Sequence, residues 1–269
     1  MLNRMAEREG RSIVKRKRII VMVMLVAASA AIAAVAGFAF WPSDTSPARP
    51  KAVIIDQLAI TDPNPDFVNA AGTRLQDAGY AVDYYRSDEV TVDFYRDLPT
   101  HGYKLIVIRS HASQKVFERD PATDRAIEKD GVALFTNERY SDLTHTDDQR
   151  DYRLGIGSYP QLAITDKYFL IGPAFVQSSM NGAFHDGTIV LMGCGGLSTT
   201  GLAQAFQRRG VTQFISWDTL VTAAHTDAAT TALLSHLVTD GLPAADAVAK
   251  TMAEVGPDPS YGSRLLAFP

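Results

Sequence analysis

Short, fully apolar runs separated by helical patterns constrain the fold of this chain most strongly. Residues 105–108 and 188–192 are uncharged and rich in β-branched side chains, which is typical of strands buried on both faces. Mainly apolar runs at 52–56, 81–85 and 213–217 alternate with segments of helical period. Strand, helix and strand in succession require right-handed crossovers and parallel pairing. The sequence therefore predicts an α/β domain built around a mostly parallel sheet.

The helical patterns lie where such a sheet needs its crossovers. Apolar residues recur at helical spacing, and glycine or proline bounds several of these segments. The polar stretch 113–187 is predicted to be an insertion in a domain of residues 51–269, with strands at 132–135 and 168–171. We expect this insertion to cover or flank the active edge of the sheet. The predicted helices cover 65–79, 90–98, 200–209, 226–239 and 244–255, and a last edge strand is predicted at 265–268.

An uncharged stretch of 23 residues, 19–41, precedes this domain. At about 1.5 Å per residue, a helix of this length crosses a hydrocarbon core of roughly 30 Å, so one transmembrane helix is predicted, with Trp41 at the interface. Residues 1–18 are basic, which predicts a cytoplasmic amino terminus and an extracytoplasmic domain. The polar, proline-rich stretch 42–50 is predicted to be the linker between the helix and this domain. The alternative is a cleaved signal peptide with Ala-Val-Ala at 34–36 as its cleavage site. The basic residues are Arg4, Arg8, Arg11, Lys15, Arg16, Lys17 and Arg18.

Composition disfavours a nucleic-acid partner. The formal net charge is -4, from 26 basic and 30 acidic residues, and the basic residues crowd the amino terminus. The remaining domain is therefore acidic, which repels phosphate backbones. His145 lies near Asp147 and Asp148, but this spacing matches no zinc or calcium pattern, and no glycine-rich phosphate loop is present. We therefore predict neither a metal nor a cofactor, and the sequence carries no signal for an oligomeric state.

Cys194 is the only cysteine, and it follows the strand 188–192 between glycines. A lone thiol serves no disulfide within the chain, so Cys194 is either a space-filling core residue or a nucleophile. His111 follows the strand 105–108 at the corresponding point. Because the carboxyl ends of parallel strands meet at one edge of a sheet, we predict a dyad in which His111 is the general base and Cys194 the nucleophile. The amides of Cys194 and Gly195 are candidates for an oxyanion hole.

Two short motifs carry a family resemblance. Arg-Ser-His-Ala-Ser at 109–113, followed by Leu-Met-Gly-Cys-Gly-Gly at 191–196, resembles the caspase-like cysteine peptidases, which include caspases, gingipains, separases and CHAT-type domains. The run 201–247 is most similar to the CHAT-type pattern. The resemblance implies a caspase-like three-layer sandwich, a protein or peptide substrate, and an oxyanion donor at Ala112, where members commonly have glycine.

Trp217 and Asp218, at the end of the next strand, are candidate substrate-binding residues. The carboxylate of Asp218 would pair with a basic side chain before the scissile bond, and Trp217 would stack on its aliphatic stem. Several caspase-like families prefer basic residues at this position, so the resemblance implies cleavage after Arg or Lys. The alternative is that Asp218 only caps a turn or the next helix.

Two other functions compete with a cysteine endopeptidase. Ala112 departs from the family pattern, which is compatible with a catalytically inactive binding or scaffolding module. An amidotransferase-like hydrolase would instead pair Cys194 with a later histidine, His225. Against this, residue 192 is Met where the motif Gly-x-Cys-x-Gly requires glycine.

Overall fold

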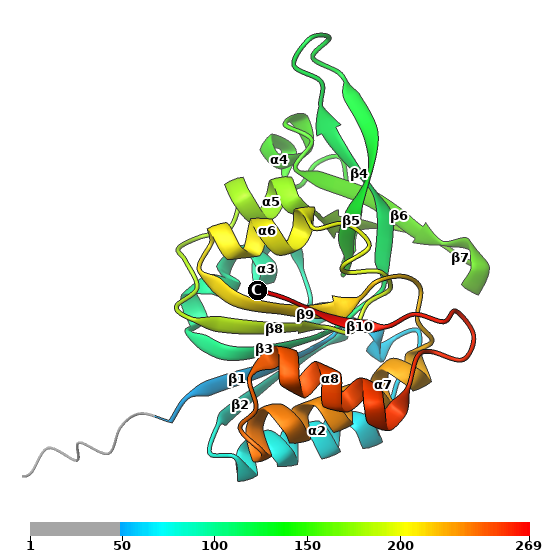
Figure 1. The fold of residues 1–269 in the computed structure, drawn as a ribbon. Coiled ribbons are helices and arrows are strands. Elements are labelled where there is room, and N and C mark those ends of the chain that lie inside the picture. Colours follow the sequence, from blue (N-terminus) through cyan, green and yellow to red (C-terminus); the bar gives the residue numbers. More distant parts are fainter. Residues whose placement is uncertain (1–48) are drawn as a thin grey trace, which may run out of the picture. The chain divides into compact units, whose positions relative to one another are not determined.

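The computed structural model describes residues 49–269, which form a mixed α/β fold (Figure 1). Six strands make the central sheet in the order β10-β9-β8-β3-β1-β2. All neighbours are parallel except β10, which runs antiparallel to β9. The predicted, mostly parallel sheet is therefore confirmed. Its strands are β1 (Lys51–Asp56), β2 (Ala81–Arg86), β3 (Tyr103–Arg109), β8 (Gly187–Leu191), β9 (Val211–Trp217) and β10 (Leu265–Phe268).

Helices cover both faces of this sheet. Figure 1 shows α3, α5 and α6 on one side and α2, α7 and α8 on the other. Alternate residues of β3 point to opposite faces, so Ile106 packs with Phe206 in one core while Val107 packs with Leu233 in the other. The helices are α2 (Pro65–Asp77), α3 (Val92–Asp97), α4 (Thr146–Arg150), α5 (Pro173–Ser178), α6 (Gly201–Arg208), α7 (Ala223–Leu234) and α8 (Ala244–Val255).

Local signals explain why two of these helices begin where they do. Asn64 precedes α2, and its Oδ1 accepts a hydrogen bond from the Phe67 amide at 3.1 Å. The Thr91 hydroxyl accepts one from the Phe94 amide at the start of α3, also at 3.1 Å. Each side chain satisfies an amide that lacks a partner within the helix.

The end of α7 differs from the sequence prediction. A single helix was predicted over 226–239, but α7 ends at Leu234 and continues as a π-helical turn, Ser235–Thr239. His236 in this turn is buried and lies 3.1 Å from the Glu254 carboxylate of α8. The wider turn accompanies a contact between helices, which the periodicity of one helix does not reveal.

The predicted insertion forms a second, antiparallel sheet with the order β4-β5-β7-β6. It begins at Ala112, directly after His111, and Figure 1 shows β4 and β5 extending beyond the central sheet. Leu134 and Phe169 of this sheet pack into the core cluster of the central sheet, so its base belongs to the same domain. The strands predicted at 132–135 and 168–171 lie within β5 and β7. The second sheet consists of β4 (Ala112–Arg119), β5 (Ala126–Arg139), β6 (Leu154–Tyr159) and β7 (Ile164–Ile171).

The predicted basic segment 1–18, the transmembrane helix 19–41 and all but the last two residues of the linker 42–50 lie outside the described residues. Within 49–269, no helix combines the length and the apolar character needed to cross a membrane.

Candidate active site

The two residues of the predicted dyad follow neighbouring strands at the same edge of the central sheet. β3 and β8 pair in parallel with Ile108 opposite Leu191, so His111 and Cys194 each lie three residues beyond the last pair. The Met192 amide still donates to the Ile108 carbonyl at 2.8 Å. The predicted adjacency of the two strands is confirmed, and their register delivers both residues to one edge.

His111 is held by its neighbours on three sides. Its Nε2 lies 3.0 Å from the Thr61 hydroxyl, and its ring centroid is 4.9 Å from that of Tyr159 and 6.3 Å from that of Phe135. Burial lowers the pKa of His111 below its ordinary value, which the nearby Asp62 carboxylate only partly opposes. The neutral imidazole, the form that accepts a proton, is therefore favoured near neutral pH.

Gln57 holds the backbone of His111 in place, and its role was not predicted from the sequence. Its side chain is fully buried, and its Oε1 accepts a hydrogen bond from the His111 amide at 2.9 Å. Its Nε2 donates to Asn137 at 2.7 Å and to the Tyr159 hydroxyl at 2.9 Å. A buried glutamine with both ends bonded fixes the turn after β1 to the start of the second sheet. Its position directly after the strand 52–56 was the only signal in the sequence.

A buried ionic cluster lies beside this network. Arg109, with no exposed surface, donates to both carboxylate oxygens of Asp227 at 2.8 and 2.9 Å and to Asp56 at 3.1 Å. Burial would lower the pKa of Arg109, but its bonds to the two carboxylates outweigh this and raise it. Arg109 also donates to the Asp62 carbonyl at 2.8 Å, next to Thr61. The cluster therefore supports the loop that contacts His111.

Cys194 is half-buried and packs against the apolar core on the α7 and α8 side of the central sheet. Its thiol lies 3.5 Å from the Val221 carbonyl, which orients the sulfur toward the segment after β9. Its own carbonyl accepts a hydrogen bond from Gln114 Nε2 of β4 at 2.8 Å. Among the described residues, neither His111 nor His225 forms a hydrogen bond with the thiol. His225 instead lies 3.2 Å from the Gly256 carbonyl.

The glycines around Cys194 are required by close contacts. A Cβ at Gly193 would lie 2.7 Å from the Ser110 carbonyl, and one at Gly196 would lie 2.1 Å from the Ser216 hydroxyl. Gly195 has φ +56°, where a side chain is strained. Only glycine lets the loop pass this close to the end of β3 and to β9, which brings the Cys194 backbone beside the turn that carries His111.

The predicted oxyanion donors differ in availability. The Gly195 amide donates to the Thr219 carbonyl at 2.7 Å, so it is occupied in this conformation. The Cys194 amide has no hydrogen-bond partner within 49–269. Ala112 lies opposite Leu134 of β5. The neighbouring residues, His111 and Phe135, are joined by a hydrogen bond from the Phe135 amide to the His111 carbonyl. Because hydrogen-bonded and non-hydrogen-bonded pairs alternate in antiparallel sheets, the Ala112 amide is directed away from β5.

The structure places the two candidate substrate-binding residues differently. Trp217 is fully buried, and its Nε1 donates to the Thr226 hydroxyl at 2.8 Å, so its ring is not available to a substrate here. One carboxylate oxygen of Asp218 accepts from the Arg264 amide at 2.9 Å, in agreement with the turn-capping alternative. Its Oδ2 has no partner among residues 49–269.

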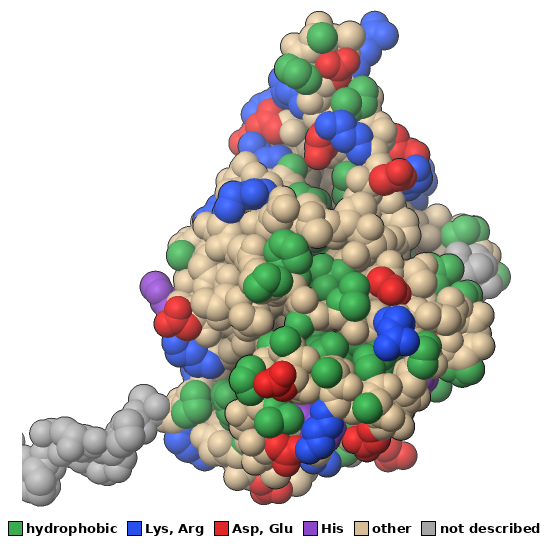
Figure 2. All heavy atoms as spheres, viewed as in Figure 1, with side chains coloured by type: hydrophobic (Ala, Val, Ile, Leu, Met, Phe, Trp, Pro, Cys, Tyr) green, Lys and Arg blue, Asp and Glu red, His purple; other side chains and the backbone are tan. Residues whose placement is uncertain are grey.

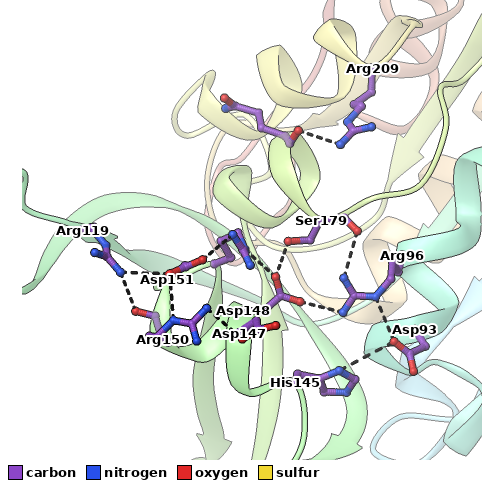
Figure 3. A network of polar contacts seen from close by, with 12 residues as sticks. Asp93, Arg96, Arg119, His145, Asp147, Asp148, Arg150, Asp151, Ser179 and Arg209 are labelled. Carbon is purple, nitrogen blue, oxygen red and sulfur yellow. Dashed lines mark hydrogen bonds and ion pairs between the residues drawn. The ribbon is translucent and has the colours of Figure 1, made fainter.

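His145 belongs to a polar network away from this edge (Figure 3). Its Nε2 lies 2.7 Å from Glu138, while the buried Asp148 accepts hydrogen bonds from Arg96 and Arg153 at 2.7 and 2.6 Å. Burial would raise the pKa of Asp148, but the bonds it accepts lower it. The network joins α3, α4 and the end of α5. No group of three potential metal ligands occurs in the described part of the chain.

No family model matches the sequence, and no curated protein matches it. Among solved structures, the chain is similar to the Arg-specific cysteine proteinase gingipain R, with a TM-score of 0.45 and 12% sequence identity. The match covers 77% of this chain and 42% of gingipain R. A likeness this distant says nothing about the chemistry of the present chain, so the case for the site rests on its own residues.

Proposed function

We propose that this chain is a cysteine endopeptidase in which His111 is the general base and Cys194 the nucleophile. The observation that carries the proposal is the register of β3 and β8, which brings a histidine and the only cysteine to equivalent positions at one sheet edge. The favoured neutral state of His111 and the glycine-lined loop of Cys194 support it. A protein or peptide is the substrate class.

The imidazole would act through Nδ1. Its Nε2 faces the Thr61 hydroxyl and would keep its proton there, whereas Nδ1 has no hydrogen-bond partner within 49–269. Nδ1 would take the proton of the Cys194 thiol after the sulfur turns from the Val221 carbonyl toward His111. Rotation about the Cα–Cβ bond of a half-buried cysteine is a small change, and catalytic hydrogen bonds are often loose without substrate.

The reaction would proceed in two steps. The thiolate would attack the carbonyl carbon of the scissile bond, and the amides of Cys194 and Ala112 would stabilise the oxyanion. The C–N bond would break as the imidazolium of His111 gives its proton to the leaving amine. Water, deprotonated by the neutral imidazole, would then hydrolyse the thioester, release the acid and restore the thiol.

Specificity for Arg or Lys would rest on Asp218 alone, because Trp217 is buried. The free Oδ2 of Asp218 is available to a cation even while Oδ1 holds the Arg264 amide. Peptides with Arg, Lys, Asp and Leu before the scissile bond test this directly. The basic peptides should turn over fastest, and Asp218→Asn should reduce that preference; equal turnover of the Leu peptide would rule it out.

The sequence of residues 1–50 supports a location for this activity. We propose that the domain is tethered on the extracytoplasmic side of a membrane by the apolar segment 19–41, with the basic amino terminus in the cytoplasm. Protease digestion of intact and permeabilised cells that express the full chain would test this orientation. Protection of the domain in intact cells would contradict it.

A catalytically inactive binding module is the second candidate, and specific contacts favour it. Three groups of the proposed site are bonded elsewhere: His111 Nε2 to the Thr61 hydroxyl, the Cys194 thiol to the Val221 carbonyl and the Gly195 amide to the Thr219 carbonyl. The deciding experiment measures hydrolysis of a fluorogenic peptide library by the full chain, with Cys194→Ala and His111→Ala as variants. Turnover that both variants lose supports the peptidase; no turnover by the unmodified chain supports the binding module.

A further inference from the structure

The second sheet carries an apolar pocket of about 460 Å³. Its walls come from all four strands of the sheet, from α4 and from the segment after α4, and Lys167 is the only charged residue in the lining. This volume falls within the range of small-molecule sites. The lining side chains include Phe117, Tyr152, Leu154, Ile156, Lys167 and Phe169.

The pocket lies on the face of the second sheet that is turned away from His111. Phe169 and Leu154 belong to the core shared with the central sheet, whereas Tyr168 and Tyr159 belong to the small cluster on the other face. Neighbouring residues of a strand point to opposite faces. Since Tyr159 is the residue that contacts His111, the pocket is separate from the candidate active site.

The pocket exposes large apolar side chains. Phe117 of β4 is 40% exposed and Ile156 of β6 is 44% exposed, although both stand on the same side as the buried Phe169. The sheet therefore continues its apolar face beyond the part that α3 and α5 cover. Burying such side chains beneath an apolar ligand is favourable by about 25 cal/mol for each Å² removed from water.

The charge of the pocket lining favours a ligand with a negative group. The lining contains no Asp or Glu, and the ammonium of Lys167 has no ion-pair or hydrogen-bond partner among the described residues. Other lysines of the second sheet differ, because Lys115 pairs with Asp130 at 2.7 Å and Lys129 with Glu118 at 2.5 Å. Figure 2 shows opposite charges interspersed on the protruding part of the molecule. One free cation beside an apolar cavity is complementary to an apolar chain with a single negative charge.

We propose that this pocket binds a free medium-chain carboxylic acid, with the hydrocarbon chain among Phe117, Ile156 and Phe169 and the carboxylate at Lys167. An extended peptide fits less well, because the lining is mainly apolar and offers few polar side chains to its many amide groups. The single lysine matches one carboxylate. This ligand site does not depend on the peptidase proposal.

The test uses the full chain and dodecanoic acid that carries a photoreactive diazirine on its hydrocarbon tail. Irradiation should label peptides that contain Phe117, Ile156 or Phe169, as mapped by mass spectrometry. Unlabelled dodecanoate should compete at least fivefold better than dodecanol, which lacks the charge, and Lys167→Ala should weaken binding about fivefold. Ile156→Asp should reduce labelling at least tenfold, because it places a carboxylate in the cavity.

Leu143→Asp is the matched control, because Leu143 is 84% exposed and lies outside the pocket. It should leave labelling unchanged, and circular dichroism should show that each variant is folded. Labelling that is spread over the chain, or unchanged in Ile156→Asp, would overturn the proposal. So would preferential labelling by a photoreactive phospholipid in vesicles, or competition by an apolar peptide but not by dodecanoate.

Discussion

The two sides of the candidate site are built by different means. On the histidine side, buried polar side chains hold the position: Gln57 binds the His111 amide, and Arg109 braces the loop of Thr61. On the cysteine side, glycines let the backbone pass close to the end of β3 and to β9, and main-chain groups make most of the bonds around Cys194.

This difference predicts how each side responds to mutation. A network of buried polar side chains fails when one member is removed, because its partners remain without hydrogen bonds. A loop held by close backbone contacts fails when atoms are added, because the surrounding backbone cannot yield. Substitutions that remove polar side-chain groups should therefore destabilise the histidine side more, whereas substitutions that add atoms should destabilise the cysteine side more.

The largest effect is expected from Arg109→Met. The variant leaves the carboxylates of Asp56 and Asp227 buried without their cation, which should cost about 3–5 kcal/mol of unfolding free energy. Urea denaturation of the full chain measures it. Arg119→Met is the control, since its pairs with Asp124 and Asp151 lie at the surface and should together contribute less than about 1 kcal/mol. Similar losses in both variants would contradict the structural role of the cluster.

Gly196→Ala tests the cysteine side by adding one methyl group. The new Cβ would lie 2.1 Å from the Ser216 hydroxyl and 2.6 Å from Leu191, so we expect a loss of about 2–3 kcal/mol. Gly72→Ala in α2 is the matched control, because nothing lies within 4 Å of its Cβ. It should gain about 0.5–1 kcal/mol from helix propensity. If thermal melts show Gly196→Ala to be neutral, the loop is looser than its contacts indicate.

A pair of glutamines compares the two sides directly. Gln57→Leu removes the bonds to the His111 amide, Asn137 and Tyr159 in a fully buried place, which should cost about 2 kcal/mol. Gln114→Leu removes the half-buried bond to the Cys194 carbonyl and the exposed bond from the Ser198 hydroxyl, and should cost about 1 kcal/mol or less. Chemical denaturation measures the loss of unfolding free energy in each variant. A larger loss in Gln114→Leu would contradict the greater role of buried side chains on the histidine side.

The smallest effect concerns pH. The folded-state pKa of His111 is lowered, so its neutral form contributes stability that is fully present above about pH 6.5 and is lost as pH falls toward the folded pKa. Replacing His111 by Gln should flatten this part of the stability profile. Denaturation between pH 5 and 8 measures the slope, and an unchanged slope in His111→Gln would show that other groups cause the acid sensitivity.

The sequence predicted the central sheet well because buried parallel strands are short, apolar and bounded by glycine or helices. It also placed His111 and Cys194 at one edge, since strand ends are visible as the point where apolar residues stop. The second sheet was only half predicted. β4 carries Lys115 and Glu118 in exposed ion pairs, and β6 contains Gly155 and Gly157, so neither shows an apolar strand pattern.

Contacts between distant segments were beyond the sequence. Arg109 lies two residues before His111 in the chain, but its pairing with Asp227 depends on how α7 approaches β3. The occupied Gly195 amide and the buried Trp217 likewise depend on how the segment after β9 packs. Residue type and spacing identified the candidate residues, whereas their availability to a substrate followed from the fold.

The coupling of His111 to Cys194 is the central claim, and the pH dependence of thiol alkylation tests it most directly. The rate at which iodoacetamide modifies Cys194 is measured from pH 5 to 9 in the full chain and in His111→Ala, with thermal melts to confirm folding. We predict that the unmodified chain reacts faster than His111→Ala near neutral pH, with an inflection at the lowered pKa of His111 that is missing from the profile of His111→Ala. Superimposable profiles would contradict the dyad.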